Sequence, residues 1–279
     1  MPSKPGANGF KAVPLKQTVI SPAKINLCLH LLGTRPDGYH NLDSLVSFAE
    51  FGDRLTFDLQ PASEMNIETI FSGPFADQVS QDDNSILSAV RALCTALRPP
   101  LTGNLSGQIQ ILKQIPPQAG LGGGSSNAAT VLNTLNAHLT HPLDEEALAD
   151  LGSNIGSDIA VCVRQGCQQQ EPSKNFVLWR MTGRGETVTP VDIKSEKSAH
   201  HPWLVPSKPT MGLSTATVYR CLESQGFSGT IAPEERFSDP LSEQEVLTLL
   251  AETGNDLEPA ARALCPEINQ IIRWLSRPT

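Results

Sequence analysis

The stretch "IPPQAGLGGGSSNAATVLNTLNAHL", residues 115–139, joins a segment of alternating apolar residues to a segment with helical periodicity. Four of the five residues from Gly120 to Gly124 are glycine. Glycine costs conformational entropy in a folded chain, so the run either lets a ligand approach the backbone or serves as a linker. Because it joins the two segments without a polar spacer, the linker interpretation is disfavoured.

A glycine run between a strand and a helix predicts a phosphate-binding loop. Free backbone N–H groups and the positive end of the helix dipole meet at such a junction and attract an anion. Ser125 and Ser126 add hydroxyl groups at the helix start. A purely structural turn is the alternative. The P-loop is excluded because no lysine follows the glycines, and the dinucleotide fingerprint because Ser125 stands where it requires glycine.

The flanking sequence contains both strand and helix patterns. Period-two alternation predicts strands at residues 18–31, 54–59 and 108–115, and further strands are expected at 175–181 and 201–205. Helices are expected after a cap at Asn84, after the glycine run, from an aspartate cap at Asp144 to Leu151 with Gly152 just past the end, from Ser214 to Cys221, and from Pro266 onward. The chain is therefore α+β or α/β.

Composition limits the function classes. The 279 residues carry a formal net charge of -8, which argues against a general binder of nucleic acid or of anionic membranes. No apolar run is long enough to span a bilayer, and residues 1–17 have no apolar signal core and read as a disordered tail. The six cysteines are scattered without zinc spacing, so we expect reduced thiols in a cytoplasmic protein.

The glycine run also carries a family resemblance. "GLGGGSSNAA" resembles the central motif of the GHMP kinases, small-molecule kinases whose ATP phosphates lie on such a loop. Residues 21–46, "SPAKINLCLHLLGTRPDGYHNLDSLV", are similar to the opening of the branch that acts on a cytidine diphosphate-linked polyol in the non-mevalonate isoprenoid pathway. "IGSDIAVCV", "GRGE", "GLSTATVY" and "GNDLEPAA" follow in that branch's order. Mevalonate and homoserine kinases lack the P-D-G-Y-H element in this form.

The resemblance implies a two-domain GHMP kinase fold of the α+β class. An ATP-binding domain, like domain 2 of ribosomal protein S5, would cover residues 18–170, and a ferredoxin-like substrate domain would cover 171–279, with a boundary near Gln170. GHMP kinases carry a late M-S-G-S-G motif, whereas the last glycine here is Gly254. The C-terminal domain is therefore expected to be incomplete.

The resemblance further implies an enzyme that uses ATP and Mg²⁺ to phosphorylate the 2-hydroxyl of 4-diphosphocytidyl-2-C-methylerythritol. A lysine on a strand is usually a solvated edge charge, and an aspartate after Gly-Ser usually caps a helix. The family motifs instead assign Lys24 and Asp158 to catalysis. Asp158 would accept the proton of the substrate hydroxyl, and Lys24 would keep Asp158 ionised and stabilise developing charge. The alternative is a truncated, catalytically impaired GHMP-fold protein that binds nucleotide or ligand without turnover.

The other site residues also follow from the family motifs. The ATP-binding candidates are Pro117, Gln118, Ala119, Gly120, Leu121, Gly122, Gly123, Gly124, Ser125, Ser126 and Asn127, with Ser125 the candidate ligand of the Mg²⁺ that ATP carries. The substrate-binding candidates are Asn26, Tyr39, His40, Thr215 and Tyr219. His40 would read the base edge, and the cytosine would stack on Tyr219. We expect a small-molecule substrate, no nucleic-acid partner and no membrane partner; the oligomeric state stays open.

Overall fold

The computed structural model describes residues 8–36, 38–79, 84–97, 103–168, 177–194, 206–227, 229 and 241–276. The chain forms two compact units. Unit 1 comprises Met1–Ala23, Glu50–Pro117 and Gly122–Ser173, and unit 2 comprises Lys24–Ala49, Gln118–Leu121 and Lys174–Thr279. Two long strands, β1 (Leu15–Thr34) and β2 (His40–Ala62), contribute residues to both units and pair with each other. The predicted boundary near Gln170 lies outside the described residues and stays a prediction.

The strands of unit 1 surround the C-terminal part of β2. This part pairs antiparallel with β4 (Asn104–Leu112), which pairs in parallel with β3 (Asn66–Ser72). Leu55, Phe57 and Leu59 alternate along β2 and are buried, which confirms the strand predicted at 54–59. The strand predicted at 108–115 is wrong at its end, because β4 stops at Leu112. The N–H of Lys113 still donates to the carbonyl of Ser72 in β3, but the N–H groups of Gln114 and Ile115 donate to a buried carboxylate instead of a neighbouring strand.

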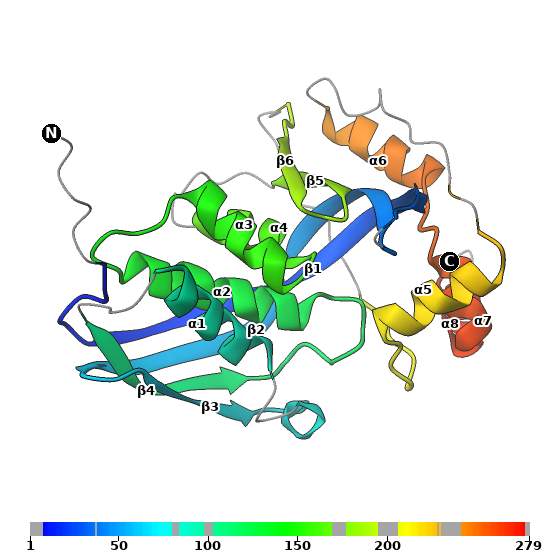
Figure 1. The fold of residues 1–279 in the computed structure, drawn as a ribbon. Coiled ribbons are helices and arrows are strands. Elements are labelled where there is room, and N and C mark those ends of the chain that lie inside the picture. Colours follow the sequence, from blue (N-terminus) through cyan, green and yellow to red (C-terminus); the bar gives the residue numbers. More distant parts are fainter. Residues whose placement is uncertain are drawn as a thin grey trace, which may run out of the picture. The chain divides into compact units, whose positions relative to one another are not determined.

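Four helices of unit 1 pack against one another on one side of its strands (Figure 1). They are α1 (Ser85–Ala96), α2 (Gly123–Ala137), α3 (Glu145–Ile155) and α4 (Ile159–Gln168), and a short 3-10 helix, η1, spans Ala76–Gln78. The predicted caps are confirmed, since the Asn84 side chain accepts from two N–H groups of α1 and Asp144 accepts from the N–H of Ala147 at 2.8 Å.

The predicted end of α3 at Leu151 is wrong. The helix continues through Gly152 to Ile155, and Gly156 follows as its C-cap. Gly152 is buried inside the helix, where an added Cβ would lie 2.8 Å from Cγ2 of Ile159. This glycine therefore allows close packing of α3 on α4 and does not terminate the helix.

Helix α2 is enclosed by the rest of unit 1, because every residue from Ser126 to Asn136 is buried. Several of these side chains are polar, and hydrogen bonds pair most of their polar atoms that the structure describes, the exception being Asn127 Oδ1. Asn133 Nδ2 donates to the carbonyl of Val163 at 3.1 Å, and Asn136 exchanges two hydrogen bonds with the backbone of Leu143. Buried polar groups of this kind are tolerated only when they are paired.

The predicted disordered tail is wrong for residues 8–17. Phe10 is buried and its N–H donates to the carbonyl of Gly103, while β1 already begins at Leu15. Asn8 also bonds to the segment after α2, since its Nδ2 donates to the carbonyl of His141 at 2.7 Å. Residues 1–7 lie outside the described residues.

In unit 2 the N-terminal part of β2 pairs antiparallel with β5, from Leu42↔Gly183 to Val46↔Trp179, and β5 pairs antiparallel with β6. The remaining elements are β5 (Leu178–Gly183), β6 (Thr187–Val191), α5 (Thr215–Ser224), α6 (Glu243–Glu252), α7 (Glu258–Leu264) and α8 (Glu267–Leu275). Leu45 and Leu178 form a buried core with Val246 and Leu249 of α6. Ser214 caps α5 as predicted, and the strand expected at 201–205 lies outside the described residues.

All six cysteines are free thiols, as predicted, and three of them are buried. Burial raises the pKa of Cys28 and Cys94, and it raises the pKa of Cys167 to about 11. These three thiols therefore stay protonated near neutral pH. Within the described residues, none of the helices combines the length and the apolar character needed to cross a membrane.

Candidate nucleotide and acceptor sites

The glycine run ends on the N-terminus of α2. Gly122 occupies the N-cap position in the left-handed region, with φ 61°, and no side chain among the described residues caps this terminus. Gly120 also has a left-handed φ of 74°. A helix start leaves its first N–H groups without partners in the helix, so these groups remain available to an anion. The junction therefore fits a phosphate group.

Gly123 and Gly124 lie in the first turn of α2, and packing restricts the first of them. A Cβ on Gly123 would lie 3.0 Å from Cγ2 of Ile115, and a Cβ on Gly124 would lie 3.6 Å from Oγ of Ser85. The Ser85 hydroxyl also donates to the carbonyl of Gly124 at 2.8 Å. At Gly123, side-chain packing leaves little room for a larger residue.

Gln118 is the single non-glycine residue with a positive φ among the described residues, at 54°. Its backbone lies in unit 2, where its carbonyl accepts from the N–H of Leu213 at 3.1 Å. A left-handed conformation costs a residue with a side chain about 1 kcal/mol. The hydrogen bond to Leu213 holds the start of the loop in this conformation.

The polar residues that follow the glycines differ in their surroundings. Ser126 is buried, and its Oγ accepts from the hydroxyl of Ser21 at 2.9 Å. Asn127 is buried as well, and its Nδ2 donates to Asp53. Ser125 is only half-buried. Of the three candidates, Ser125 is therefore the one best placed to meet a ligand.

A buried carboxylate that sequence reasoning missed lies beneath this junction. Asp53 is 0% exposed and accepts four hydrogen bonds. The donors are Nζ of Lys113, the N–H of Gln114 at 2.7 Å, the N–H of Ile115 at 2.8 Å and Nδ2 of Asn127 at 2.9 Å. In the sequence, the signal for this buried pair is a charged residue at the edge of each of two apolar segments, Asp53 in "FGDRL" and Lys113 in "ILKQI".

In unit 2 the structure places Lys24 and Asn26 on β1. Lys24 is 3% exposed, and its N–H donates to the carbonyl of Leu121 at 3.0 Å. Asn26 Nδ2 donates to Oγ of Ser44 at 2.7 Å, and the Ser44 hydroxyl donates to the carbonyl of Cys28 at 2.6 Å. Ser44, which was not predicted as a site residue, therefore fixes the amide of Asn26.

The structure brings two predicted base-binding residues together in unit 2. The rings of His40 and Tyr219 lie 5.2 Å apart at an interplanar angle of 43°. His40 is buried, with Nε2 3.4 Å from Oγ1 of Thr34 and 3.7 Å from Oε1 of Glu223. The pair combines an aromatic surface with a polar ring edge, as recognition of a base requires.

The remaining candidates are less enclosed. Tyr39 is exposed, and the guanidinium of Arg184 lies 5.2 Å from its ring centroid. Thr215 is the exposed first residue of α5. In unit 1, Asp158 is half-buried directly before α4, where a helix cap would stand.

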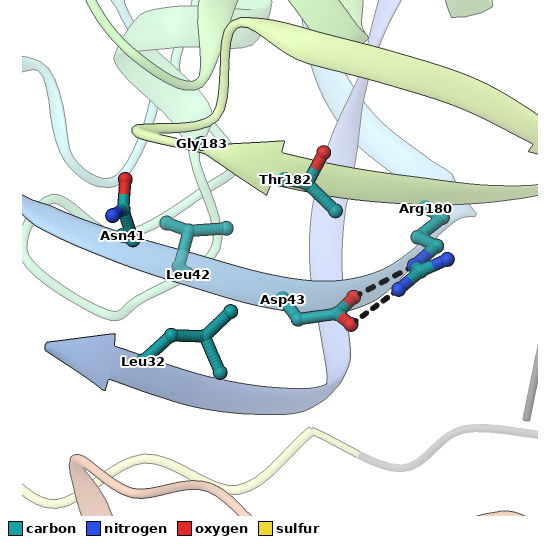
Figure 2. Close-up of a pocket in the computed structure, with 7 residues that line it drawn as sticks. All are labelled: Leu32, Asn41, Leu42, Asp43, Arg180, Thr182 and Gly183. Carbon is teal, nitrogen blue, oxygen red and sulfur yellow. Dashed lines mark hydrogen bonds and ion pairs between the residues drawn. The ribbon is translucent and has the colours of Figure 1, made fainter. Parts of the chain in front are cut away.

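Unit 2 also contains a cavity of about 490 Å³ at β1, β2 and β5 (Figure 2). It is lined by Leu32, Asn41, Leu42, Asp43, Arg180, Thr182 and Gly183. Asp43 accepts two hydrogen bonds from Arg180, at 2.9 and 2.7 Å. None of the lining residues was predicted as a site residue, and the charges of Asp43 and Arg180 neutralise each other.

Comparison with known proteins identifies the class. The family model described as GHMP kinases N terminal domain matches residues 84–166, which include the glycine run and Asp158. The fold and this match define a GHMP kinase of the α+β class, a small-molecule phosphotransferase that uses ATP.

Individual relatives identify the branch of the GHMP kinases to which the chain belongs. A protein from Marinobacter nauticus named 4-diphosphocytidyl-2-C-methyl-D-erythritol kinase is 35% identical over 260 residues, which cover 93% of this chain and 79% of that protein. The protein of the same name from Hahella chejuensis is 34% identical over 266 residues, 93% of this chain and 79% of its own. A solved structure of 4-(cytidine 5'-diphospho)-2C-methyl-D-erythritol kinase has a TM-score of 0.57 at 27% identity and covers 91% of this chain and 81% of that one. The chain belongs to the 4-diphosphocytidyl-2-C-methyl-D-erythritol kinase family.

Proposed function

We propose that the protein transfers the γ-phosphoryl group of ATP to the 2-hydroxyl of 4-diphosphocytidyl-2-C-methyl-D-erythritol. The observation that carries this proposal is the junction at Gly122, where α2 begins in a left-handed glycine without a side-chain cap among the described residues. Family membership supplies the acceptor, since the named relatives are kinases of this compound.

The nucleotide would lie on the loop from Pro117 to Asn127. In this proposal the N–H groups at the start of α2 bind the phosphates, and the Ser125 hydroxyl binds the Mg²⁺ that accompanies ATP. The metal would supply charge neutralisation between the phosphates. Ser126 and Asn127 would support the loop from below, because their side chains are already bonded to Ser21 and Asp53.

The acceptor would be held through its cytosine. His40 would direct a hydrogen bond to the base edge while Tyr219 stacks on the ring, and Tyr39 and Thr215 would border the same region. Asn26, whose amide is fixed by Ser44, would contact the polyol. A base held by stacking and a few directed hydrogen bonds is recognised with good specificity.

Catalysis would require one proton acceptor and one cation. We assign the first role to Asp158 and the second to Lys24, each by its position in the family motif. Phosphoryl transfer depends mainly on positioning and electrostatic stabilisation, so two such groups suffice in addition to the bound metal.

The rival function is that of a GHMP-fold protein that binds ligand without turnover. No observation in the part of the chain that the structure describes favours it. The deciding experiment incubates the full chain with MgATP and the cytidine substrate and measures ADP formation and the phosphorylated product. Substrate-dependent ADP formation supports the kinase; ATP binding without ADP formation supports the rival.

Replacing Gly123 by Ala should weaken ATP binding. The new Cβ would lie 3.0 Å from Cγ2 of Ile115, so either the Ile115 side chain or the first turn of α2 must move by a few tenths of an ångström. Overpacking of this kind costs roughly 1–3 kcal/mol, and we expect about a tenfold rise in the Kd of MgATP by calorimetry. Binding of the cytidine substrate should stay unchanged.

The matched control for this change is Gly254→Ala, whose Cβ would meet nothing within 4 Å. A linker would tolerate alanine at residue 123 and could even gain stability through a restricted unfolded chain. Unchanged ATP affinity together with an unchanged or raised Tm would therefore defeat the phosphate-loop interpretation.

Replacing His40 by Ala should raise the KM for the cytidine substrate far more than the KM for ATP. Loss of a directed hydrogen bond in a buried site costs roughly 1–3 kcal/mol, which corresponds to about 5- to 150-fold. Steady-state kinetics with each substrate varied in turn measures both constants. His138→Ala removes another buried histidine, from unit 1, and should leave the cytidine KM unchanged. Equal effects of His40→Ala on both KM values would show that His40 is structural.

A further inference from the structure

We infer that Asp53 is a positioning residue that fixes both ends of the nucleotide loop. This inference rests on the proposed function, because it concerns how the same loop receives ATP. Asp53 itself is 0% exposed and cannot meet the nucleotide, so it would act through the groups that it holds.

The first end of the loop is the exit from β4. Asp53 Oδ1 accepts from the N–H groups of Gln114 and Ile115, and Oδ2 accepts from Nζ of Lys113. Backbone N–H groups in a strand normally donate to a neighbouring strand. Here they are turned to a side chain, so the chain leaves the sheet after Leu112 and enters the loop in a defined direction.

The second end is the start of α2. Asn127 lies just past the first turn, and its Nδ2 donates to the same carboxylate oxygen that Lys113 contacts. Asn127 Oδ1 is buried and has no hydrogen-bond partner among the described residues. The orientation of this amide therefore depends on Asp53, and one carboxylate connects the segments on both sides of the glycines.

The two ends also lie close to each other. The position of a Cβ on Gly123 is 3.0 Å from Cγ2 of Ile115 and 3.4 Å from Nζ of Lys113. A displacement of Lys113 or Ile115 would therefore move directly against the first turn of α2. The N–H groups proposed to bind phosphate belong to this turn, so the geometry of the anion site depends on Asp53.

The test replaces Asp53 by Asn in the full chain. The new amide nitrogen would face two donors, Lys113 Nζ and Asn127 Nδ2, while its oxygen can still accept from Gln114 and Ile115. We expect the Kd of MgATP to rise at least tenfold by calorimetry. The Kd of the cytidine substrate should stay within twofold, which shows in the same sample that the protein is folded.

The matched control is Asp43→Asn, which removes a carboxylate that is 1% exposed from its ion pair with Arg180 in unit 2. It should lower the Tm, as we also expect of Asp53→Asn, without changing the Kd of MgATP. If Asp53→Asn lowers the Tm but leaves ATP affinity unchanged, or weakens both substrates equally, Asp53 is merely structural and the inference is overturned.

Asn127→Ala provides a second variant. It leaves the Asp53 carboxylate paired with Lys113, so no buried charge loses its partner. It should raise the Kd of MgATP several-fold, and its effect should not add to that of Asp53→Asn, because both break the same connection. Additive effects would mean that Asn127 contacts ATP by itself, which overturns the connection through Asp53. If the Asp53 variant does not fold, an unchanged ATP affinity in Asn127→Ala overturns the inference.

Binding of MgATP to the wild-type protein distinguishes a failure of the proposed function from a failure of the inference about Asp53. If it binds no MgATP, the proposed function fails and the inference fails with it. If it binds MgATP and the variants do not alter that affinity, only the positioning role of Asp53 fails.

Discussion

Replacing Asp158 by Asn is expected to lower kcat by roughly 10²- to 10⁴-fold, the usual contribution of a general acid or base. The amide cannot accept the proton of the substrate hydroxyl, although it has nearly the same shape. The Kd of MgATP should stay within a few-fold of the wild type, because the carboxylate would serve the acceptor side of the reaction. Single-turnover ADP formation measures the chemical step, and calorimetry measures the affinity.

A matched control for this change is Asp150→Asn, an exposed aspartate on α3 in the same unit. It should leave kcat unchanged. Turnover of Asp158→Asn within tenfold of the wild type would contradict the catalytic assignment. Asp158 would then be the helix cap that its place before α4 also permits.

Replacing Lys24 by Met is expected to lower kcat by roughly 10²- to 10³-fold, as removal of one group that stabilises transition-state charge usually does. Methionine keeps most of the apolar stem, which matters because Lys24 is only 3% exposed. The KM for ATP and for the cytidine substrate should change much less than kcat, since the cation would act mainly on charge that develops during transfer.

The control on the same strand is Lys16→Met, which removes an exposed lysine paired with Asp58 at 3.1 Å. Exposed pairs contribute little, so both stability and kcat should stay near the wild type. If Lys24→Met raises both KM values and leaves kcat unchanged, Lys24 contributes to binding and not to the chemical step.

Local sequence patterns predicted most elements of the described chain, because alternation and helical periodicity reflect which side chains face a core. They did not single out β3, β6, α6 or α7, and the predicted end of α5 at Cys221 falls short of Ser224. The predicted ends of β4 and α3 were wrong because of tertiary contacts. β4 ends just before Gln114 and Ile115, whose N–H groups donate to Asp53, and α3 continues through Gly152 because Ile159 packs there. Neither contact leaves a trace in the local periodicity.

Candidate site residues could be predicted only where they belong to a contiguous sequence motif. The glycine run was visible because strand, loop and helix follow one another, and the ring pair of His40 and Tyr219 came from family motifs. Asp53 was not visible, since its partner Lys113 lies 60 residues away and the fold alone brings them together. Ser44 was missed similarly, because its role is to orient the Asn26 amide.

The burial of α2 has a consequence for the free-energy cost of binding ATP. Residues Ser126 to Asn136 of this helix are all buried and have little freedom to unwind, so the part of α2 that supports its more exposed first turn stays in place whether or not a ligand is present. Ordering a flexible backbone costs about 1–2 kcal/mol per residue, and the binding energy must offset that cost. In the proposed site, the half that belongs to α2 would be preorganised, and the phosphate groups would meet N–H groups already in position.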